Sequence, residues 1–192
     1  LARETGLSAV TAGILIARGI STAEQARRFI EPVLERDWVA TDGVAGMAEA
    51  AERVARAVQD RERIVVFGDF DLDGISAAAV AALGLRSLGA SVTATVPHRF
   101  REGYGLSAAA AERVLALEPQ LVVTVDCGIA NAEEVAWLRE RGVDVVVTDH
   151  HEPGAGLPLA IAVADPKLAA GGPALSGAGV ALELVRGVGR LL

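Results

Sequence analysis

Six side chains of the kinds that hold divalent cations closely follow short, mainly apolar runs of the sequence. The runs cover residues 64–67, 121–125 and 144–148. The six side chains are Asp69, Asp71, Asp126, Asp149, His150 and His151. Carboxylate oxygens and imidazole nitrogens together suit Mn²⁺ or Mg²⁺ better than a metal that prefers thiolates. If these turns meet in space, they form a metal site.

The first acidic turn contains Asp69 and Asp71, separated by one residue. Alternate residues of an extended chain point to the same side, so both carboxylates can enter one pocket. Carboxylates held this close raise each other's pKa unless a cation neutralises them. The alternative is an acidic surface turn that caps the following helix. Asp73 precedes Gly74 at the start of a helical pattern, and we expect it to be a cap or a supporting residue rather than a ligand.

The other two turns allow similar alternatives. Asp126 either ligates metal or caps the helix that follows, and Gly128 suits both cases because it lets the backbone approach a ligand closely. The chain has only three histidines, and His150 and His151 are adjacent beside Asp149. We expect the two rings to diverge and to differ in function, one ligating metal and the other facing substrate as an acid or hydrogen-bond donor. Two loop histidines without a task are the alternative.

Strand patterns alternate with helix patterns from residue 60 onward, which predicts an α/β fold with a parallel sheet of about five strands flanked by helices. In such a sheet the carboxyl ends of the strands lie along one edge, where ligand sites form. The expected strands are 64–67, 92–96, 121–125, 144–148 and 160–164. The expected helices are 75–88, 107–117 and 132–141, and residues 175–192 should begin with a glycine-rich turn and then become helical. The polar turns should therefore converge.

Residues 1–59 are expected to form an N-terminal helical segment without site chemistry, and residues 60–192 the domain that carries the site. Two overlapping capping boxes begin at Ser21 and Thr22, and Pro32 should end that helix. A further amphipathic helix is expected over residues 48–60. The chain starts without Met and ends inside a helical pattern, so we expect it to be part of a longer protein.

Composition limits the class of protein. The 192 residues are 52% hydrophobic and 22% charged, which is typical of a folded globular chain. The net charge of −7, with Lys167 the only lysine, argues against a free-standing nucleic-acid binder. A hydrolase remains possible, because metals or a neighbouring domain can supply positive charge. The single cysteine, Cys127, and the absence of a long apolar stretch favour a cytoplasmic protein without a membrane anchor.

Three motifs resemble, in order and spacing, those of the DHH phosphoesterase superfamily. They are VFGDFDLDGI at 66–75, TVDCGI at 124–129 and TDHHE at 148–152. Within that superfamily, PHR at 97–99, EGYGL at 102–106 and LSGAGV at 175–180 are similar to RecJ-type exonucleases. The resemblance implies metal-dependent phosphodiester hydrolysis, namely 5′→3′ exonuclease activity on single-stranded DNA in DNA repair and recombination.

The resemblance also implies residue roles. Asp69 would ligate one metal, Asp71 and His150 the other, and Asp126 would bridge the two. The cofactor would be one or two ions of Mn²⁺ or Mg²⁺. His151 would contact the scissile phosphate, so the catalytic residues would be His151 and Asp126. Arg99 would lie near the substrate strand, although a surface arginine in a loop is an equal alternative.

The sequence departs from the family pattern in two respects. Some members carry a histidine two residues before the first motif Asp, where this chain has Phe67. We therefore expect one metal site to be weaker here or to be completed by water. The fourth motif, which supplies another Asp, is expected beyond residue 192. The resemblance also implies a DHHA1-like domain that closes over the nucleic acid and an OB-like domain that binds single strands, both beyond residue 192. The partner of the full-length protein would be the 5′ end of single-stranded DNA.

Three other functions remain as hypotheses. A DHH phosphodiesterase could cleave nano-RNA or a cyclic dinucleotide with the same chemistry. The chain could instead be a haloacid-dehalogenase-like phosphatase, in which Asp71 would be the nucleophile that becomes phosphorylated. That class needs a later lysine, for which Lys167 is the one candidate, and it leaves the adjacent histidines unexplained. A non-catalytic replication scaffold could keep the fold, although such relatives lose acidic and histidine positions that this chain retains.

Overall fold

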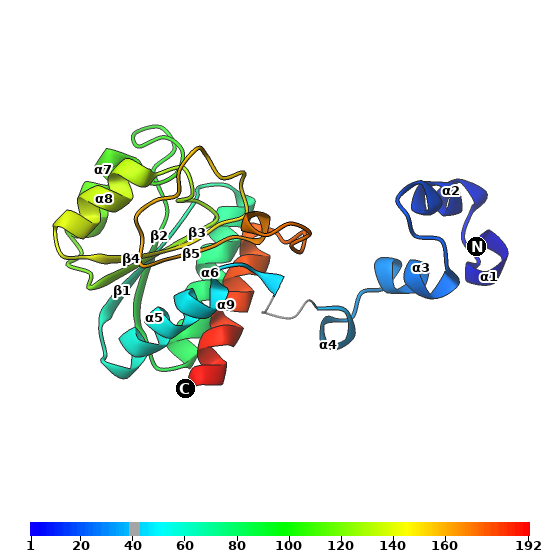
Figure 1. Cartoon of the computed structure of the whole chain (residues 1–192), viewed down its shortest axis with the longest axis horizontal. Helices are drawn as coiled ribbons and strands as arrows, with labels where there is room; N and C mark the ends of the chain where they lie inside the picture. The colour runs from blue at the N-terminus through cyan, green and yellow to red at the C-terminus, as the bar shows by residue number, and fades with distance from the viewer. Residues whose placement is uncertain (39–42) are drawn as a thin grey trace. The chain divides into compact units, whose positions relative to one another are not determined.

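The structure is a computed structural model that describes residues 1–38 and 43–192 (Figure 1). The chain forms two compact units, Leu1–Ala40 and Thr41–Leu192. The described part of the first unit consists of helices and turns, whereas the second unit contains the whole sheet. All six candidate site residues belong to the second unit.

The described part of the first unit contains α1 (Ala2–Thr5), α2 (Ala9–Ala17), α3 (Ala23–Ile30) and α4 (Leu34–Asp37). Thr22 caps α3 and forms a capping box with Gln25, which is one of the two boxes that the sequence offers. The helix ends at Ile30, before Pro32, as predicted.

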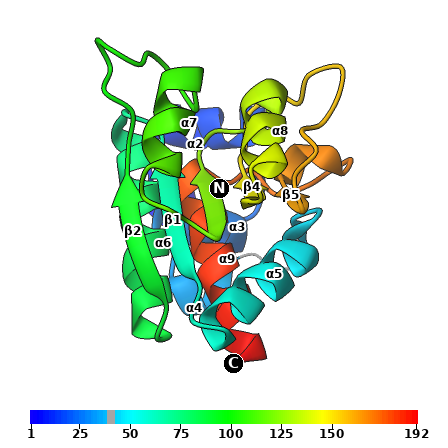
Figure 2. The same ribbon diagram turned by 90° about the vertical axis from the view of Figure 1, so that its left-hand side faces the viewer.

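The second unit is built on a parallel sheet of five strands in the order β2-β1-β3-β4-β5 (Figure 2). The strands are β1 (Arg63–Gly68), β2 (Ser91–Thr95), β3 (Leu121–Val125), β4 (Asp144–Thr148) and β5 (Ala162–Ala164). The chain moves outward from β1 to β2 and then crosses back to β3. The strand order therefore reverses between β1 and β3, which is where open α/β sheets bind ligands. The predicted fold class is confirmed.

Helices cover both faces of the sheet (Figure 1). Val65 and Phe67 pack in a core with residues of α7 and α8, whereas Ile64 and Val66 pack with residues of α5, α6 and α9. This alternation follows from the two-residue repeat of a strand that is buried on both sides. The helices are α5 (Met47–Gln59), α6 (Leu72–Ser87), α7 (Ala108–Leu115), α8 (Ala132–Glu140) and α9 (Gly177–Leu191).

Helix α5 belongs to the second unit, although we expected residues 1–59 to form a single N-terminal segment. Its buried residues share a core with β1, β3 and α9. Arg53 is 6% exposed and pairs with Glu62 and Asp144, each at 2.7 Å, which ties α5 to β4. A start of the DHH domain near residue 60 remains a prediction.

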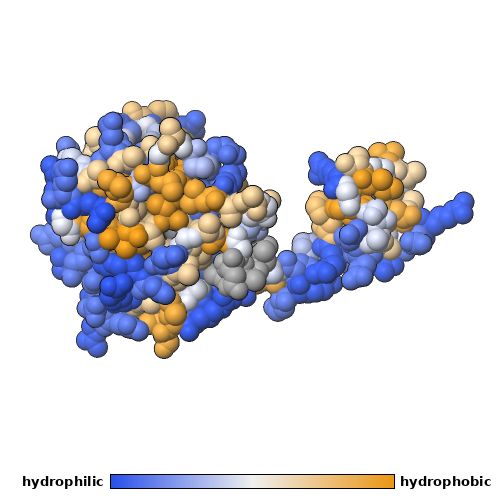
Figure 3. Space-filling model, viewed as in Figure 1, coloured by the Kyte–Doolittle hydropathy of each residue, from blue (hydrophilic) through white to orange (hydrophobic). Residues whose placement is uncertain are grey.

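The surface of the second unit is mixed. On the face shown in Figure 3, hydrophobic areas lie beside hydrophilic ones. Across the described residues, no helix combines the length and the apolar character needed to cross a bilayer.

Candidate metal centre

The polar turns after β1, β3 and β4 meet at the edge where these strands end. Asp69, Asp71 and Asp126 place one carboxylate oxygen each so that these atoms lie within 4.8 Å of one another. Asp126, His150 and His151 form a second group with the same spacing. Asp126 belongs to both groups. The structure thus brings together residues from three separate crossover units, as the strand order requires.

The first acidic turn contributes one buried and one exposed carboxylate. Asp69 is fully buried, and its Oδ1 accepts a hydrogen bond from the Gly105 N–H at 3.3 Å. Its Oδ2 has no hydrogen-bond partner among the described residues. Asp71 caps α6, since its Oδ1 accepts from the Gly74 N–H at 2.9 Å. A buried carboxylate oxygen without a donor is costly, and a bound cation would offset that cost.

Asp126 is the residue that the two groups share. It is 2% exposed, and its backbone has a φ of 60°, in the left-handed region that Asp tolerates better than most residues. Burial raises its pKa to about 6, and the nearby charge of Asp73 acts in the same direction. A divalent cation would reverse this effect, because it favours the ionised carboxylate.

His150 is held in one orientation by the backbone. Its Nδ1 lies 3.0 Å from the carbonyl oxygen of Leu175. A carbonyl can only accept, so Nδ1 carries a proton and Nε2 is the nitrogen that faces the site. That Nε2 lies 3.0 Å from Oδ1 of Asp126. A histidine whose far nitrogen donates to a carbonyl is the usual arrangement at a metal site.

His151 is held by a carboxylate instead. Its Nδ1 lies 2.7 Å from Oδ1 of Asp149, which is 1% exposed. Burial lowers the pKa of His151, but the hydrogen bond to Asp149 and its charge outweigh that effect, so the pKa is raised overall. Nε2 of His151 lies 3.3 Å from the Tyr104 hydroxyl. This nitrogen can hold a proton toward a phosphate oxygen.

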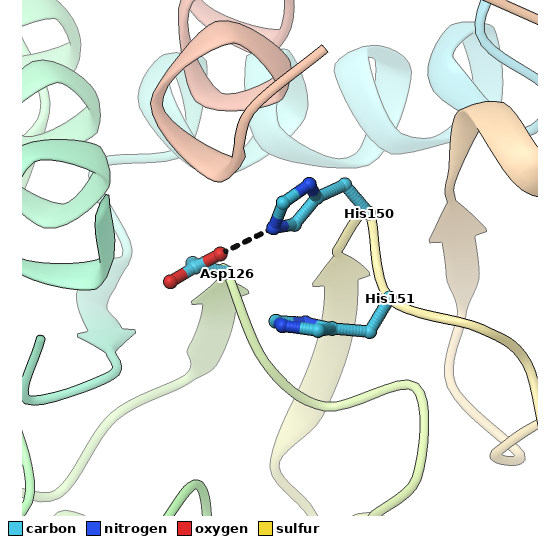
Figure 4. Close-up of side chains that lie close together, drawn as sticks. All are labelled: Asp126, His150 and His151. Carbon is cyan, nitrogen blue, oxygen red and sulfur yellow. Dashed lines mark ion pairs between the residues drawn. The ribbon is translucent and has the colours of Figure 1, made fainter. Parts of the chain in front are cut away.

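The two rings do not diverge as we expected. Figure 4 shows both imidazoles turned toward the Asp126 carboxylate, and their centroids are 4.6 Å apart. The expectation assumed an extended backbone, but the chain has left β4 before His150. Asp149 also draws the His151 ring back toward the strand end through its hydrogen bond. The two histidines differ in their partners rather than in the side to which they point.

Asp73 lies closer to the site than the sequence suggested. It does not cap its own helix. Its Oδ2 accepts from the Gly177 N–H at 2.8 Å and its Oδ1 from the Ala178 N–H at 2.9 Å, so it caps α9. Its Oδ2 is also 3.6 Å from Nε2 of His150. We expected Asp73 to be a cap or a supporting residue rather than a ligand, and here it caps α9 beside His150.

An aromatic and cationic group borders the site. The rings of Phe70 and Tyr104 contact edge to face, with centroids 6.1 Å apart, and Tyr104 contacts His151 in the same way at 6.3 Å. The guanidinium carbon of Arg99 lies 5.1 Å from the Phe70 ring centroid. Phe100, beside Arg99, is 89% exposed. Aromatic rings and an arginine beside a candidate metal site can contact nucleobases and phosphates.

The donor set of the site is oxygen and nitrogen. Cys127 follows Asp126 directly, but its thiol donates toward the Phe67 carbonyl at 3.8 Å. Burial raises the pKa of this thiol well above its usual value, so it stays protonated. Carboxylates and imidazoles without a thiolate fit Mn²⁺ or Mg²⁺.

Most of the chain matches a known protein family. The profile of the DHH family, N-terminal domain, matches residues 63–191. This chain belongs to the DHH family. Its similar relatives include single-stranded-DNA-specific exonuclease RecJ from Bacillus subtilis, 38% identical over 87% of this chain and 21% of that protein. RecJ from Escherichia coli is 39% identical over 88% of this chain and 29% of its own length.

Solved structures agree with this family. A crystal structure of exonuclease RecJ bound to manganese is similar with a TM-score of 0.71 and 40% identity, over 80% of this chain and 40% of that one. RecJ from Thermus thermophilus in complex with Mn²⁺ has a TM-score of 0.69 and 36% identity, over 92% of this chain and 24% of that one. The chain therefore spans less than half of these solved chains and less than a third of the curated relatives named above.

Proposed function

We propose that this chain is part of a metal-dependent nuclease that degrades single-stranded DNA from its 5′ end, in DNA repair and recombination. The observation that carries the proposal is the shared position of Asp126, between an acidic group and two imidazoles. The relatives named single-stranded-DNA-specific exonuclease RecJ support the substrate. The chain covers a small share of their length, so the activity is proposed for the protein that contains it.

We assign the metal ligands from the two groups of donor atoms. Asp69, Asp71 and Asp126 would hold one divalent ion, and Asp126 with His150 the other. The family resemblance pairs Asp71 with His150, whereas the spacing here favours pairing it with Asp69. Asp73 is a further carboxylate near the second ion, given its 3.6 Å distance from His150. When bound, Mn²⁺ or Mg²⁺ polarises a phosphoryl oxygen and lowers the pKa of a coordinated water.

The protein's own residues would bind and orient the substrate. Asp149 accepts a hydrogen bond from Nδ1 of His151 and favours the protonated ring. The Nε2–H of that ring can donate to an oxygen of the scissile phosphate. Arg99 supplies positive charge beside the site in a chain whose net charge is −7. A phosphate strand that enters there would meet the guanidinium and the exposed aromatic rings before the metal ligands.

Digestion of single-stranded DNA labelled at either end tests the function. The full-length protein that contains this chain should release mononucleotides from the 5′ end with Mn²⁺ or Mg²⁺ and none with a chelator. The Asp126→Asn variant should show at most about a thousandth of the wild-type rate, because the shared ligand is lost. Degradation of short RNA or a cyclic dinucleotide, with single-stranded DNA left intact, would replace the exonuclease by the alternative phosphodiesterase.

We also propose that the protein contains further DHHA1-like and OB-like domains beyond residue 192 and acts in the cytoplasm. The much greater length of the relatives supports the first point. Such domains would supply positive charge to a protein in which this chain has a net charge of −7. Binding of single-stranded DNA by the full-length protein, compared with that of residues 1–192 alone, would test this division of labour.

A further inference from the structure

The segment Leu175–Ala178 at the start of α9 contacts two side chains of the candidate metal centre through its backbone. The Leu175 carbonyl accepts from Nδ1 of His150 at 3.0 Å. The N–H groups of Gly177 and Ala178 donate to the two carboxylate oxygens of Asp73, at 2.8 and 2.9 Å. The LSGAGV sequence motif to which this segment belongs has no role in the function proposed above.

Gly177 also lies directly against the shared carboxylate. A Cβ atom at position 177 would lie 2.5 Å from Cβ and 2.6 Å from Cγ of Asp126, and closer still to Oδ1. Atoms without a bond between them do not approach this closely. Asp126 is 2% exposed and has a left-handed backbone, so its side chain has little freedom to move away. A side chain at position 177 would therefore displace the carboxylate.

The start of α9 cannot easily move instead. Ser176 caps the helix, and its Oγ accepts from the Gly179 N–H at 3.2 Å. Further along, α9 packs tightly on α6, where a Cβ at Gly84 would lie 2.5 Å from Cγ1 of Val185. The helix is thus fixed by its cap, by Asp73 and by close packing against its neighbour.

We propose that Gly177 is a positioning residue, and that the segment Leu175–Ala178 sets the places of Asp126 and His150 for metal binding. The absence of a side chain at 177 lets the shared carboxylate sit against the helix start. The Leu175 carbonyl, two residues earlier, selects the tautomer of His150. This inference rests on the proposed function, because the positions matter only if these two residues hold a cation.

The test compares Gly177→Ala with Gly189→Ala in the same helix, where a Cβ would meet Leu88 at an ordinary 3.6 Å. Mn²⁺ affinity is measured by the electron paramagnetic resonance of free Mn²⁺, and the melting temperature is measured in chelator. Gly177→Ala should bind Mn²⁺ at least about tenfold more weakly, as is typical when groups that orient ligands are changed. Gly189→Ala should bind like the wild type. In chelator, Gly189→Ala should melt close to the wild type, whereas Gly177→Ala should melt lower because of the clash with Asp126. Mn²⁺ affinities are therefore compared at a temperature at which every variant is folded.

A spectroscopic signature separates positioning from general loss of structure. In ¹⁵N spectra of the histidine rings, Gly177→Ala should shift the signals of His150 and leave those of His98 unchanged. If Gly177→Ala does not fold, Leu175→Gly takes its place, because it keeps every backbone group while loosening the chain before α9. It should likewise weaken Mn²⁺ binding and alter the His150 signals.

Unchanged Mn²⁺ affinity and unchanged His150 signals in the folded variant would overturn the inference. The wild-type chain distinguishes this failure from that of the proposed function. If the wild type binds Mn²⁺ and the variant binds it equally well, only the positioning role is lost. If the wild type binds no Mn²⁺, the proposed function fails and the inference fails with it.

Discussion

Asp149 accepts a hydrogen bond from Nδ1 of His151 at 2.7 Å, and this contact decides which nitrogen of the ring faces the site. The same carboxylate accepts from the backbone N–H groups of His150, at 2.7 Å, and Ile129, at 3.0 Å. It is therefore fixed by two segments of the chain. His151 presents Nε2 beside Tyr104, whereas His150 is oriented by a backbone carbonyl. The adjacent histidines are thus prepared for different tasks.

Replacement of each histidine should separate these tasks. His151→Ala should lower kcat about a hundredfold or more, because a proton donor to the phosphate is lost, while Mn²⁺ affinity stays within about threefold of the wild type. His150→Ala should instead weaken Mn²⁺ binding at least about tenfold. Steady-state kinetics and Mn²⁺ titration of both variants check this. The opposite pattern would exchange the two assignments.

Asp149→Asn should affect turnover through His151, to which Asp149 is hydrogen-bonded. We expect kcat to fall about 10- to 100-fold, because the ring loses the acceptor that orients it. The wild-type carboxylate raises the pKa of His151, so its protonated form persists to higher pH than in the variant. The alkaline limb of the kcat profile that follows this proton should therefore move to lower pH in Asp149→Asn. A profile that drops in height without moving would contradict the role of Asp149.

The pKa of Asp126 predicts how the stability of the metal-free chain depends on pH. Burial raises this pKa to about 6 from 3.8, so the folded chain holds the proton more tightly than the unfolded chain does. The free energy of unfolding should fall as pH rises from about 4 to about 6, by at most roughly 3 kcal/mol for a shift of about two units.

Urea unfolding in chelator, below pH of about 4 and above pH of about 7, measures this dependence. Asp126→Asn cannot ionise at this position, so its stability should change less between the two conditions. Burial also raises the pKa of Asp165 to about 6. Part of the dependence of stability on pH should therefore remain in the Asp126→Asn variant. Equal slopes in the wild type and Asp126→Asn would show that Asp126 ionises normally in the folded chain.

The central strands could be predicted from the sequence because β1, β3 and β4 are mainly apolar runs that end in a polar turn. Residues 121–125 and 144–148 were predicted with the bounds that β3 and β4 have. The place of α5 could not be predicted in the same way. An amphipathic pattern shows that a helix buries one face, but it does not show which partner covers that face.

The site was predictable only where strand ends supply its residues. Asp69, Asp126 and His150 follow strands, so sheet geometry alone brings them together. Tyr104 comes from the connection between β2 and α7, and Gly177 from the start of α9. Their contacts with the site depend on how loops and helices pack, which no local pattern encodes.

Arg99 should contribute to DNA binding through its charge. Arg99→Ala in the full-length protein should weaken single-stranded DNA binding about equally for all sequences. The slope of log affinity against log salt concentration should fall by about the amount expected for one lost phosphate contact. Arg141→Ala is the matched control. This arginine stacks on Trp137, 3.8 Å from the ring centroid, and it lies after α8, at the edge where β4 begins. Fluorescence anisotropy at several salt concentrations should separate the two variants, and an equal effect would rule out a specific role for Arg99.

Glu102 should stabilise the loop that carries Arg99 and Tyr104. Its carboxylate accepts from Arg113 at 2.7 and 3.0 Å and from the His98 N–H at 2.6 Å. The bond to Arg113 is the main cause of its lowered pKa. The stabilisation is therefore present above the unfolded value of about 4.5 and is lost as pH falls through the folded pKa.

Glu102→Gln should lose about 1 kcal/mol of stability at neutral pH, which is moderate because Arg113 is partly exposed and water screens the pair. The difference from the wild type should shrink below pH of about 4. Glu112→Gln, at an exposed position of α7, serves as the control. Denaturant unfolding at both pH values measures the effect. A constant difference at both values would mean that the carboxylate charge does not contribute.

The most direct measurement is anomalous diffraction, at the manganese absorption edge, from crystals of this chain soaked in Mn²⁺. We expect a peak about 2 Å from a carboxylate oxygen of Asp126 and from Nε2 of His150, and a second peak near Asp69 and Asp71 when both ions bind. No peak beside Asp126 at saturating Mn²⁺ would contradict the account, because Asp126 would then belong to both groups of side chains without binding a metal.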